Sequence, residues 1–402
     1  MIWIRKLLHS KTQSKPLYLQ KIIKPLYIVT SIIGLFPYSV RFVKSKHSFV
    51  IIRKSIYANS LCGVTVCLVI IGFQALHIQE VFLASESVNL TEAIMTQMNY
   101  VLELIGLITF CVVAYVCAFL NRKKYVKMLN QITATWYSLP PNNNSNNILT
   151  YLRFQVNVVC MGTLLVVLVL QTSVNYTRNN SLWKMVLVTF TFNLPQMIQF
   201  FFFFFFFFLF IYLIQWHCQR LVKDNTNITN ASGFIQVHNR TTLNLRQMEL
   251  IYVKAFEIKT DINKAFQGPI LATALQTFHS IVSEAHIIYH GLTIQKSITT
   301  HEILNCSIWI AYQILKICSL AYSGNLLKVE ALKIGQILHK IPTEHRDTRW
   351  LMEIQHFSTL ISYQNIELTV YGYFPLNATL IYNMLASATM YLIILVQFDK
   401  RE

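Results

Sequence analysis

The sequence predicts an all-α integral membrane protein with seven transmembrane helices. Of its 402 residues, 54% are hydrophobic and only 13% are charged, and the mean hydropathy is +0.44. A soluble domain carries about 25% charged residues, and no water-soluble fold of this length could bury so many Phe, Leu and Ile side chains. These proportions exclude a cytosolic enzyme and favour a chain that crosses a membrane several times.

Seven segments contain the roughly 20 predominantly apolar residues that a membrane-spanning helix needs. They are Ile56–Ile78, Asn99–Leu120, Leu152–Val174, Leu182–Trp216, Gly268–Leu292, Ile303–Tyr322 and Leu376–Phe398. The fourth is over-long and contains Pro195, which predicts a tilt, a kink or a protrusion beyond the bilayer. The apolar stretch Pro25–Val40 is too short to span and contains Gly34 and Pro37, so we expect an interfacial or buried cytoplasmic helix there.

The distribution of Lys and Arg predicts which side of the membrane each loop faces. The segment before the first span holds 11 of them and no acid. Together with three loops and with Lys316 at the inner end of span six, this side holds 29 basic residues against 5 on the other. Because basic loops stay in the cytoplasm, we expect the N-terminus inside and the C-terminus outside. The same bias explains the net charge of +17 without a nucleic-acid partner.

No motif in the sequence indicates an enzyme, a cofactor or a structural metal. GxSxG, HExxH and P-loop patterns are absent, so an intramembrane transferase using His and Glu has no motif behind it. None of the eight cysteines forms a CxxC pair. The nine consecutive Phe residues at Phe200–Phe208 form a helix that is aromatic all round. Lipid-facing bulk is therefore favoured over a ligand platform for this tract.

Two segments make the sequence similar to the insect gustatory receptors. One is KPLYIVTSIIGLFPYSV, Lys24 to Val40, and the other is GYFPLNATLIYNMLASATMYLIILVQFDK, Gly372 to Lys400. In that family the last span ends in Thr-Tyr, five hydrophobic residues and Gln-Phe. Tyr391, the five residues after it and Gln397-Phe398 fit this frame, although Met390 stands in the place of the Thr. The related odorant receptors share the topology, but the Gln-Phe ending favours the gustatory branch.

The resemblance implies a ligand-gated cation channel in the plasma membrane that assembles as a homo- or hetero-tetramer. Its last span would line the pore, and the inner ends of spans four to six with the loop before span seven would form a cytoplasmic anchor. The ligand would be a small-molecule tastant. Sugar receptors of this family tend to carry an acid just after the Tyr of the motif, where this sequence has Leu392. A bitter or other non-sugar tastant is therefore favoured.

This topology divides the chain into five parts. We expect a cytoplasmic N-terminal segment at 1–55 and a ligand-binding bundle of helices one to six with their loops at 56–322. A cytoplasmic anchor loop is expected at 323–375, the pore-lining helix at 376–398 and a short extracellular tail at 399–402.

Span seven carries a stripe of residues on one helix face. Its members are Thr379, Asn383, Ser387, Met390, Ile394 and Gln397. If the stripe lines a pore, its inner part is wet, Met390 and Ile394 form an apolar constriction, and Gln397 lies at the outer mouth. If it does not, the stripe hydrogen-bonds to another span. The residues assigned to the pore and gate are Asn383, Ser387, Met390, Tyr391, Ile394, Gln397 and Phe398.

Polar residues in the outer halves of the spans are candidates for a small-molecule pocket. A charge at the centre of a span costs about 2.5–3.5 kcal/mol, so Glu103 in span two pairs with a histidine, stays protonated or binds a polar ligand. Span five adds His279, Ser283, Glu284, His286, Tyr289 and His290. The other spans add Gln171, Thr191, Asn193, Gln196, Trp309, Tyr312 and Gln313.

Each of these residues also has a plainer interpretation. Histidines near the interface are often partly solvated, and polar side chains often join helices without binding a ligand. His286 and His290 stand at i, i+4, a spacing that can bind zinc, but no third ligand is evident.

Two other classes of membrane receptor or carrier fit the sequence less well. A G-protein-coupled receptor needs an outside N-terminus, and the sequence has neither Asp-Arg-Tyr after span three nor Asn-Pro-x-x-Tyr in span seven. A transporter often shows paired halves with broken spans, and no convincing internal repeat is present.

Overall fold

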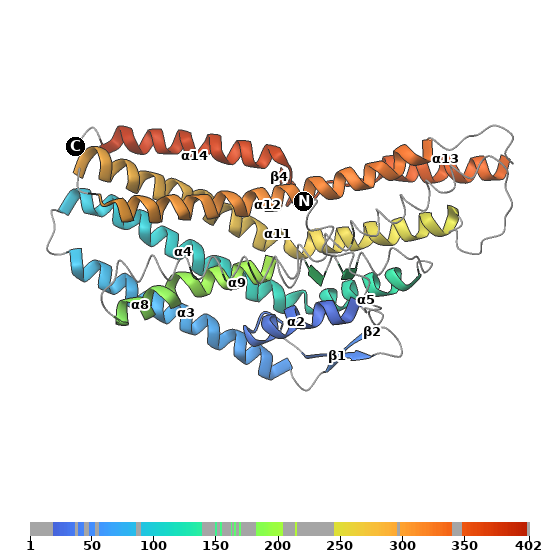
Figure 1. The fold of residues 1–402 in the computed structure, drawn as a ribbon, viewed down its shortest axis with the longest axis horizontal. Coiled ribbons are helices and arrows are strands. Elements are labelled where there is room, and N and C mark those ends of the chain that lie inside the picture. The colour runs from blue at the N-terminus through green and yellow to red at the C-terminus, as the bar shows by residue number, and fades with distance from the viewer. Residues whose placement is uncertain are drawn as a thin grey trace.

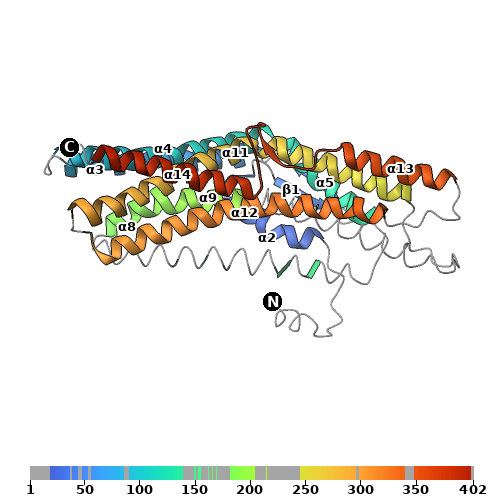
Figure 2. The ribbon, with the colours of Figure 1, turned by 90° about the horizontal axis from the view of Figure 1, so that it is seen from above.

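The computed structural model shows an elongated bundle whose helices run roughly along one axis (Figure 1, Figure 2). It describes residues 19–36, 39–43, 48–52, 56–85, 90–138, 182–203, 245–295, 298–339 and 348–399, with a few single residues between 149 and 214. The C-terminus lies at one end of the bundle and α13 (Thr348–Tyr363) at the other. We call the end with the C-terminus the outer end, following the predicted orientation.

The regular elements among the described residues are helices and two short hairpins. Before the first predicted span lie α2 (Leu19–Ile32) and an antiparallel pair, β1 (Ser39–Val43) and β2 (Ser48–Ile52). The second pair is β3 (Thr369–Val370) and β4 (Phe374–Pro375). The other elements are α3 (Ile56–Ser85), α4 (Leu90–Leu120), α5 (Arg122–Ser138), α8 (Leu182–Val188), η3 (Thr189–Asn193), α9 (Leu194–Phe202), α11 (Leu245–His290), η5 (Gly291–Gln295), α12 (Thr300–His339) and α14 (Ala378–Asp399).

Five helical segments among the described residues are long and apolar enough to cross a membrane. They are Ser60–Glu80, Val101–Leu120, Leu182–Phe202, Thr300–His339 and Ala378–Gln397. Each overlaps a predicted span, so the all-helical membrane architecture is confirmed. Predicted span five is the outer part of α11, where Gln, His and Ser side chains lower the hydropathy. Predicted span three lies almost entirely outside the described residues, so the number of seven spans and their orientation stay predictions.

The expected irregularity of span four is a π-helical turn. Residues Thr189–Asn193 form η3, and Pro195 follows in the first turn of α9. Proline has no N–H and clashes with the preceding turn of a regular α-helix. A wider turn just before it removes that clash, and Val188 and Leu194 keep helical dihedral angles on either side.

The described part of the Phe tract is packed inside the molecule, which corrects the prediction that it faces lipid. Phe201, Phe202 and Phe203 are at most 4% exposed. The Phe203 ring stacks on Phe110 of α4, with 5.8 Å between centroids, and Phe202 lies 5.4 Å from Phe266 of α11. Because α9 contacts both α4 and α2, a helix that is aromatic all round finds partners on several sides. Residues 204–208 lie outside the described part.

The predicted N-terminal helix is shorter than expected and is held against the first two spans. It ends at Ile32, and the chain then forms β1. The Tyr115 hydroxyl of α4 donates to the Ile33 carbonyl at 2.8 Å. Gly34 has a φ of +81°, and a Cβ there would lie 2.6 Å from the backbone of Gly63. Only glycine can end the helix at so close a contact.

Two helices are about twice as long as the bilayer core. α11 has 46 residues and α12 has 40, which correspond to roughly 69 and 60 Å at 1.5 Å per residue. α11 therefore continues predicted span five inward as one helix that begins at Leu245. The predicted loop at 323–375 likewise begins as a continuation of α12 to His339, because no proline lies between Tyr322 and His339 to stop the helix.

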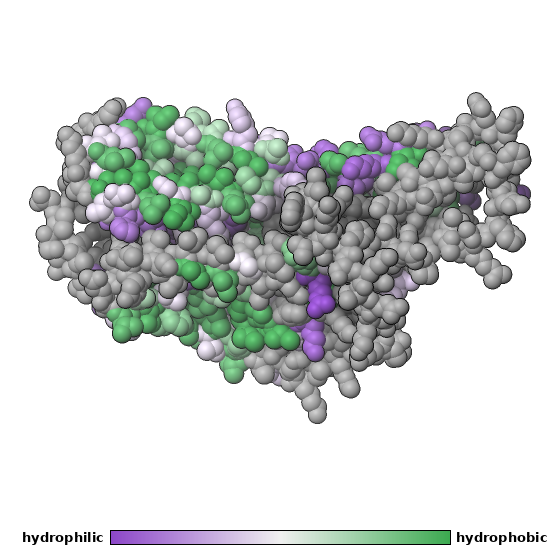
Figure 3. All heavy atoms as spheres, in the orientation of Figure 1, coloured by the Kyte–Doolittle hydropathy of each residue, from purple (hydrophilic) through white to green (hydrophobic). Residues whose placement is uncertain are grey.

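The surface divides along the bundle in the way that a membrane protein requires. Hydrophobic side chains cover the end that carries α14 and α3, and hydrophilic ones appear toward α13 (Figure 3). The exposed apolar residues of α3 include Leu61, Val64, Leu68 and Ile71. These side chains form the face that lipid would cover.

Candidate functional site

Glu103 of α4 is the acceptor at the centre of a buried polar network. It is only 3% exposed. The Ser280 hydroxyl of α11 donates to its Oε1 at 2.6 Å, and Trp309 Nε1 of α12 donates to the same oxygen at 2.9 Å. The hydrogen bonds of this acid thus come from a serine and a tryptophan rather than from a histidine of span five. Donors from two other helices offset part of the cost of placing an acid within the bundle.

Ser280 also joins α11 to α12 directly. Its Oγ accepts from Trp309 Nε1 at 2.8 Å and from Gln313 Nε2 at 3.1 Å. One turn further in, Thr277 Oγ1 donates to Gln313 Oε1 at 3.4 Å. The sequence analysis named Trp309 and Gln313 but missed Ser280, Thr277 and Thr273. These hydroxyls recur at steps of three and four on one face of span five. The histidines of span five are spaced in the same way, so the spacing could have identified the hydroxyls too.

Lys316 lies inside the bundle, which corrects its assignment to the cytoplasmic end of span six. Its Nζ donates to Gln199 Oε1 at 2.9 Å and to Gln276 Oε1 at 3.0 Å, and it lies 5.6 Å from the centroid of the Tyr312 ring. Gln199 Nε2 in turn donates to Thr273 Oγ1 at 3.1 Å. Without Lys316, the predicted cytoplasmic side still holds 28 basic residues against 5.

Several buried polar groups of η3, α9 and α11 have unused hydrogen-bonding capacity. Both amide atoms of Gln196 are buried and make no hydrogen bond to any described residue, and the same holds for the hydroxyls of Thr191 and Ser283. Phe192, which follows Thr191 in the chain, has its ring 6.3 Å from that of Trp309 between centroids. Buried polar atoms normally have partners, so a molecule that reached these groups would supply the missing ones. Asn193, also buried, lies on the same π-helical turn.

The histidines of span five belong to the bundle interior. His286 and His290 are buried, at 1% and 7% exposed, and their rings lie 6.0 Å apart between centroids. The alternative of partly solvated histidines is therefore wrong for these two. His279 is half-buried, and its Nε2 lies 3.0 Å from the carbonyl oxygen of Asn99 on α4. Glu284 and Tyr289 are half-buried beside this face.

α14 has a buried face and an exposed face. The buried residues are Leu380, Met384, Ala388 and Leu395, and they pack toward α11 and α12. The whole predicted stripe lies on the exposed face: Thr379, Asn383, Ser387, Met390, Ile394 and Gln397. Within one protomer the stripe therefore does not pack against another described span. Tyr391 is exposed, with its ring 6.3 Å from Phe278 of α11, and the Phe398 side chain lies outside the described set.

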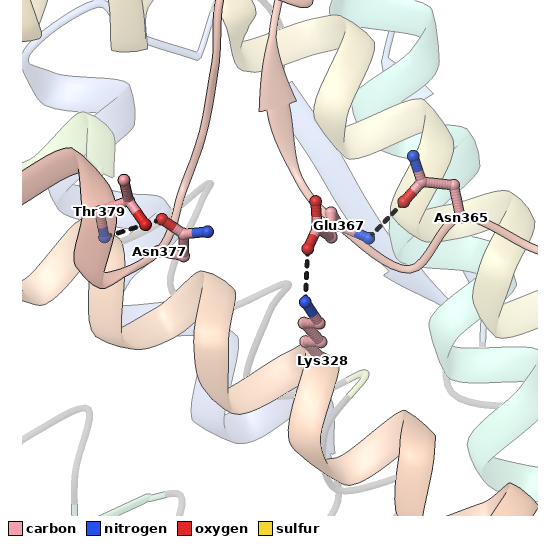
Figure 4. Close-up of polar contacts among 5 residues, drawn as sticks. All are labelled: Lys328, Asn365, Glu367, Asn377 and Thr379. Atoms are coloured by element: carbon pink, nitrogen blue, oxygen red, sulfur yellow. Dashed lines mark hydrogen bonds and ion pairs between the residues drawn. The ribbon is translucent and has the colours of Figure 1, made fainter.

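A short linker, residues 364–377, connects α13 to α14 and is held from two sides. From α11, Lys259 Nζ donates to the Asn365 carbonyl at 2.7 Å. From α12, Lys328 forms an ion pair with Glu367, and Figure 4 shows its side chain reaching across to that carboxylate. The Glu367 N–H donates to Asn365 Oδ1 at 2.9 Å. The sequence analysis missed these contacts, because their partners are far apart in the chain.

The rest of the linker is a tight hairpin that leads into α14. Tyr371 and Gly372 have φ angles of 48° and 77°, the left-handed conformation of a two-residue turn. The Leu376 N–H donates to the Leu368 carbonyl at 2.8 Å. Asn377 Oδ1 accepts from the Thr379 N–H at 2.9 Å (Figure 4), which is an N-cap for α14.

Gly324 of α12 lies against this hairpin. A Cβ at Gly324 would lie 2.1 Å from the Leu376 carbonyl oxygen. The backbones of α12 and the linker can therefore approach this closely only because residue 324 has no side chain.

Burial also changes the acidity of one lysine at the linker. It lowers the pKa of Lys259 to about 8, because the ammonium loses water, while the nearby Glu367 carboxylate opposes this shift. The side chain is mostly buried, and its Nζ lies 5.1 Å from the centroid of the Phe256 ring.

Comparison with known proteins identifies the group to which this chain belongs. A family model described as 7tm Chemosensory receptor matches residues 23–402. The chain belongs to this family. The receptor is 22% identical to gustatory and pheromone receptor 32a of Drosophila melanogaster over 149 residues, which are 37% of this chain and 32% of that protein. The matched part thus spans about a third of that relative's length.

Two solved structures share the fold of the receptor. One is the insect olfactory receptor OR5 from Machilis hrabei in complex with eugenol, with a TM-score of 0.67 and 15% identity over 94% of this chain and 98% of that chain. The other is a second structure of the same olfactory receptor, with a TM-score of 0.66, 14% identity and the same coverage. The resemblance to the insect gustatory receptors, drawn from the two sequence segments, is confirmed. The chain is thus a multi-pass membrane receptor and not an enzyme.

Some predicted site residues lie outside what the structure describes. Gln171 of span three is one of them. Asn193, Gln196, Trp309 and Gln313 lie near Glu103, Lys316 or the unused polar groups. The role of each in ligand binding stays a prediction.

Proposed function

We propose that the receptor is a ligand-gated cation channel of the plasma membrane in which four subunits surround a pore lined by α14. The observation that carries this proposal is the exposed polar stripe of α14. Hydroxyl and amide side chains in a span favour a bundle interior or a water-filled cavity over lipid. A symmetric ring of such stripes places them around one aqueous path.

The outer part of the stripe supplies the gate. Met390 and Ile394 are exposed and apolar, and side chains of this kind close a pore by excluding water. Gln397 lies one turn further out and places a ring of amide dipoles at the mouth. Tyr391 lies near Phe278, so it joins the pore helix to α11.

The ligand is a small molecule with both aromatic and hydrogen-bonding character. Support comes from the Phe192 and Trp309 rings and from the unused polar groups of Thr191, Gln196 and Ser283. The structural relative from Machilis hrabei was solved with eugenol, a phenol of this chemical kind. A bitter or other non-sugar tastant fits the absence of an acid at Leu392.

A ligand bound beside Trp309 acts on the contact between α11 and α12. Trp309 and Gln313 of α12 hydrogen-bond to Ser280 of α11, so a ligand that competes for these donors changes how the two helices meet. A ligand that fits the open arrangement better shifts the population toward it.

The test is a whole-cell current recording from cells that express this chain, under G-protein blockade, with eugenol, quinine and sucrose as probes. We expect a cation current that survives blockade and whose selectivity or gating changes in Ile394→Ala and Gln397→Ala. Leu385→Ala is the matched control, because Leu385 is exposed on α14 and lies three or four residues from no member of the stripe. A signal that disappears under G-protein blockade would contradict the channel, and equal effects of all three variants would contradict the pore face.

A further inference from the structure

The two long helices connect the buried network to the linker. α11 carries Ser280 in the network and Lys259 at the linker, 21 residues apart, which is roughly 31 Å along a helix. α12 carries Gln313 and Lys328, 15 residues and roughly 22 Å apart. Each stretch lies within one helix, α11 with Pro269 between its two contacts and α12 with no proline. A displacement at the outer contact therefore reaches the inner one most directly through α12.

Hydrogen bonds and buried side chains join the linker to the first turn of α14. Leu368, Val370 and Leu376 are buried, and the hairpin hydrogen bonds join the segment before β3 to the segment after β4. The Asn377 cap then fixes the start of α14 to the hairpin. A pull on Asn365 or Glu367 is thus passed to the helix that carries the stripe.

The contacts that hold the linker are suited to adjusting an equilibrium. The Lys328 and Glu367 side chains are 40% and 36% exposed, and ion pairs at this exposure contribute little to folding. A small energy difference between two arrangements can still change their ratio severalfold. Lys259 of α11 holds the same segment through the Asn365 carbonyl, so the two lysines act on one short stretch of chain.

We propose that Lys259 and Lys328 are positioning residues that couple α11 and α12 to the pore helix by holding the linker. Their contacts set the balance between the closed and the open pore. This inference rests on the channel function proposed above.

The test measures two quantities: the basal current, and the concentration of eugenol, quinine or sucrose that gives half of the maximal current. The variants are Lys328→Gln, Glu367→Gln and the swapped double variant Lys328→Glu with Glu367→Lys. We expect each single variant to shift both quantities about two- to fivefold in the same direction, and the swap to restore them. Lys259→Met should give a shift of similar size, and Lys259→Arg should recover most of it. The matched control is Lys333→Gln, because Lys333 pairs with Glu330 within α12 and does not touch the linker.

Surface expression separates a folding defect from a change in gating. If the variants reach the surface normally and their currents match the unmodified receptor, or if Lys333→Gln shifts them equally, the coupling role is overturned. If the unmodified receptor binds a probe but conducts no current, the proposed channel function fails instead. The pair Lys328→Cys with Glu367→Cys then decides the coupling in purified protein. A disulfide rate that the probe changes supports the coupling, and an unchanged rate overturns it.

Discussion

The network around Glu103 and the lysine contacts at the linker both involve α11 and α12, yet they lie in opposite environments. In the network, charged groups are held by neutral partners: Glu103 by Ser280 and Trp309, and Lys316 by two glutamines. At the linker, Lys328 pairs directly with Glu367 where water reaches both. A group without water needs every hydrogen bond from the protein, whereas a wet ion pair can break at little cost. We therefore expect changes in the network to affect folding and binding together, and changes in the exposed Lys328–Glu367 pair to affect gating alone.

The largest expected effect is in the network. Glu103→Ala removes the acceptor of both Ser280 and Trp309 and should cost about 3 kcal/mol or more, seen as a fall in surface expression and in the midpoint of thermal unfolding. Glu103→Gln keeps an acceptor oxygen and should lose clearly less. Equal losses in the two variants would show that the hydrogen bonds do not matter and that the charge does.

A smaller effect is expected at the linker, where one close backbone contact also contributes to folding. Gly324→Ala places a methyl group 2.1 Å from the Leu376 carbonyl oxygen, and such overpacking costs about 1–3 kcal/mol. Gly335→Ala is the control on the same helix, since its Cβ would meet its nearest neighbour at an ordinary 3.6 Å. We expect thermal unfolding at lower temperature for the first variant and at equal or higher temperature for the second. Two equally stable variants would mean that the linker yields at this contact.

The smallest effect is a pH dependence at Lys259, whose pKa of about 8 lies below the ordinary 10.5. Below pH 8 this lysine is charged in both the folded and the unfolded state, and folding pays the full cost of burying the charge. Between pH 8 and 10.5 the folded state releases its proton first, so this cost falls. The charged groups facing Lys259 are Glu367 and, through it, Lys328. We expect the unmodified receptor to gain thermal stability relative to Lys259→Met as pH rises from 8 to 10, and a difference that stays constant would contradict the shifted pKa.

The sequence predicted the helical membrane architecture and the two faces of α14 because both follow from local periodicity. Apolar length identifies a span, and the steps of three and four residues place Asn383 and Ser387 on one face whatever surrounds them. The same reasoning failed for Lys316 and for the Phe tract. Whether a side chain faces lipid, water or another helix depends on neighbours distant in the chain, such as Gln199 for Lys316 and Phe266 for Phe202.

The linker contacts lie beyond sequence reasoning for a second reason. Lys259 and Lys328 are ordinary basic residues of segments predicted to be cytoplasmic, and a count of charges treats them like any others. Only the fold brings them to the same three residues, 365–367. The close contact at Gly324 could not be predicted either, because a lone glycine in a helix does not reveal which backbone segment packs against it.

The exposed stripe of α14 has a consequence for the life of the protein in the cell. A lone subunit in a bilayer presents amides and hydroxyls at Thr379, Asn383, Ser387 and Gln397 to acyl chains, which offer them no hydrogen bonds. The free energy of such a subunit in the membrane of the endoplasmic reticulum is therefore higher than that of an assembled one. The exposed stripe is a feature that membrane quality control can recognise. Under the proposed tetrameric assembly, export to the cell surface therefore requires assembly, and subunits made in excess of their partners are expected to be retained and degraded.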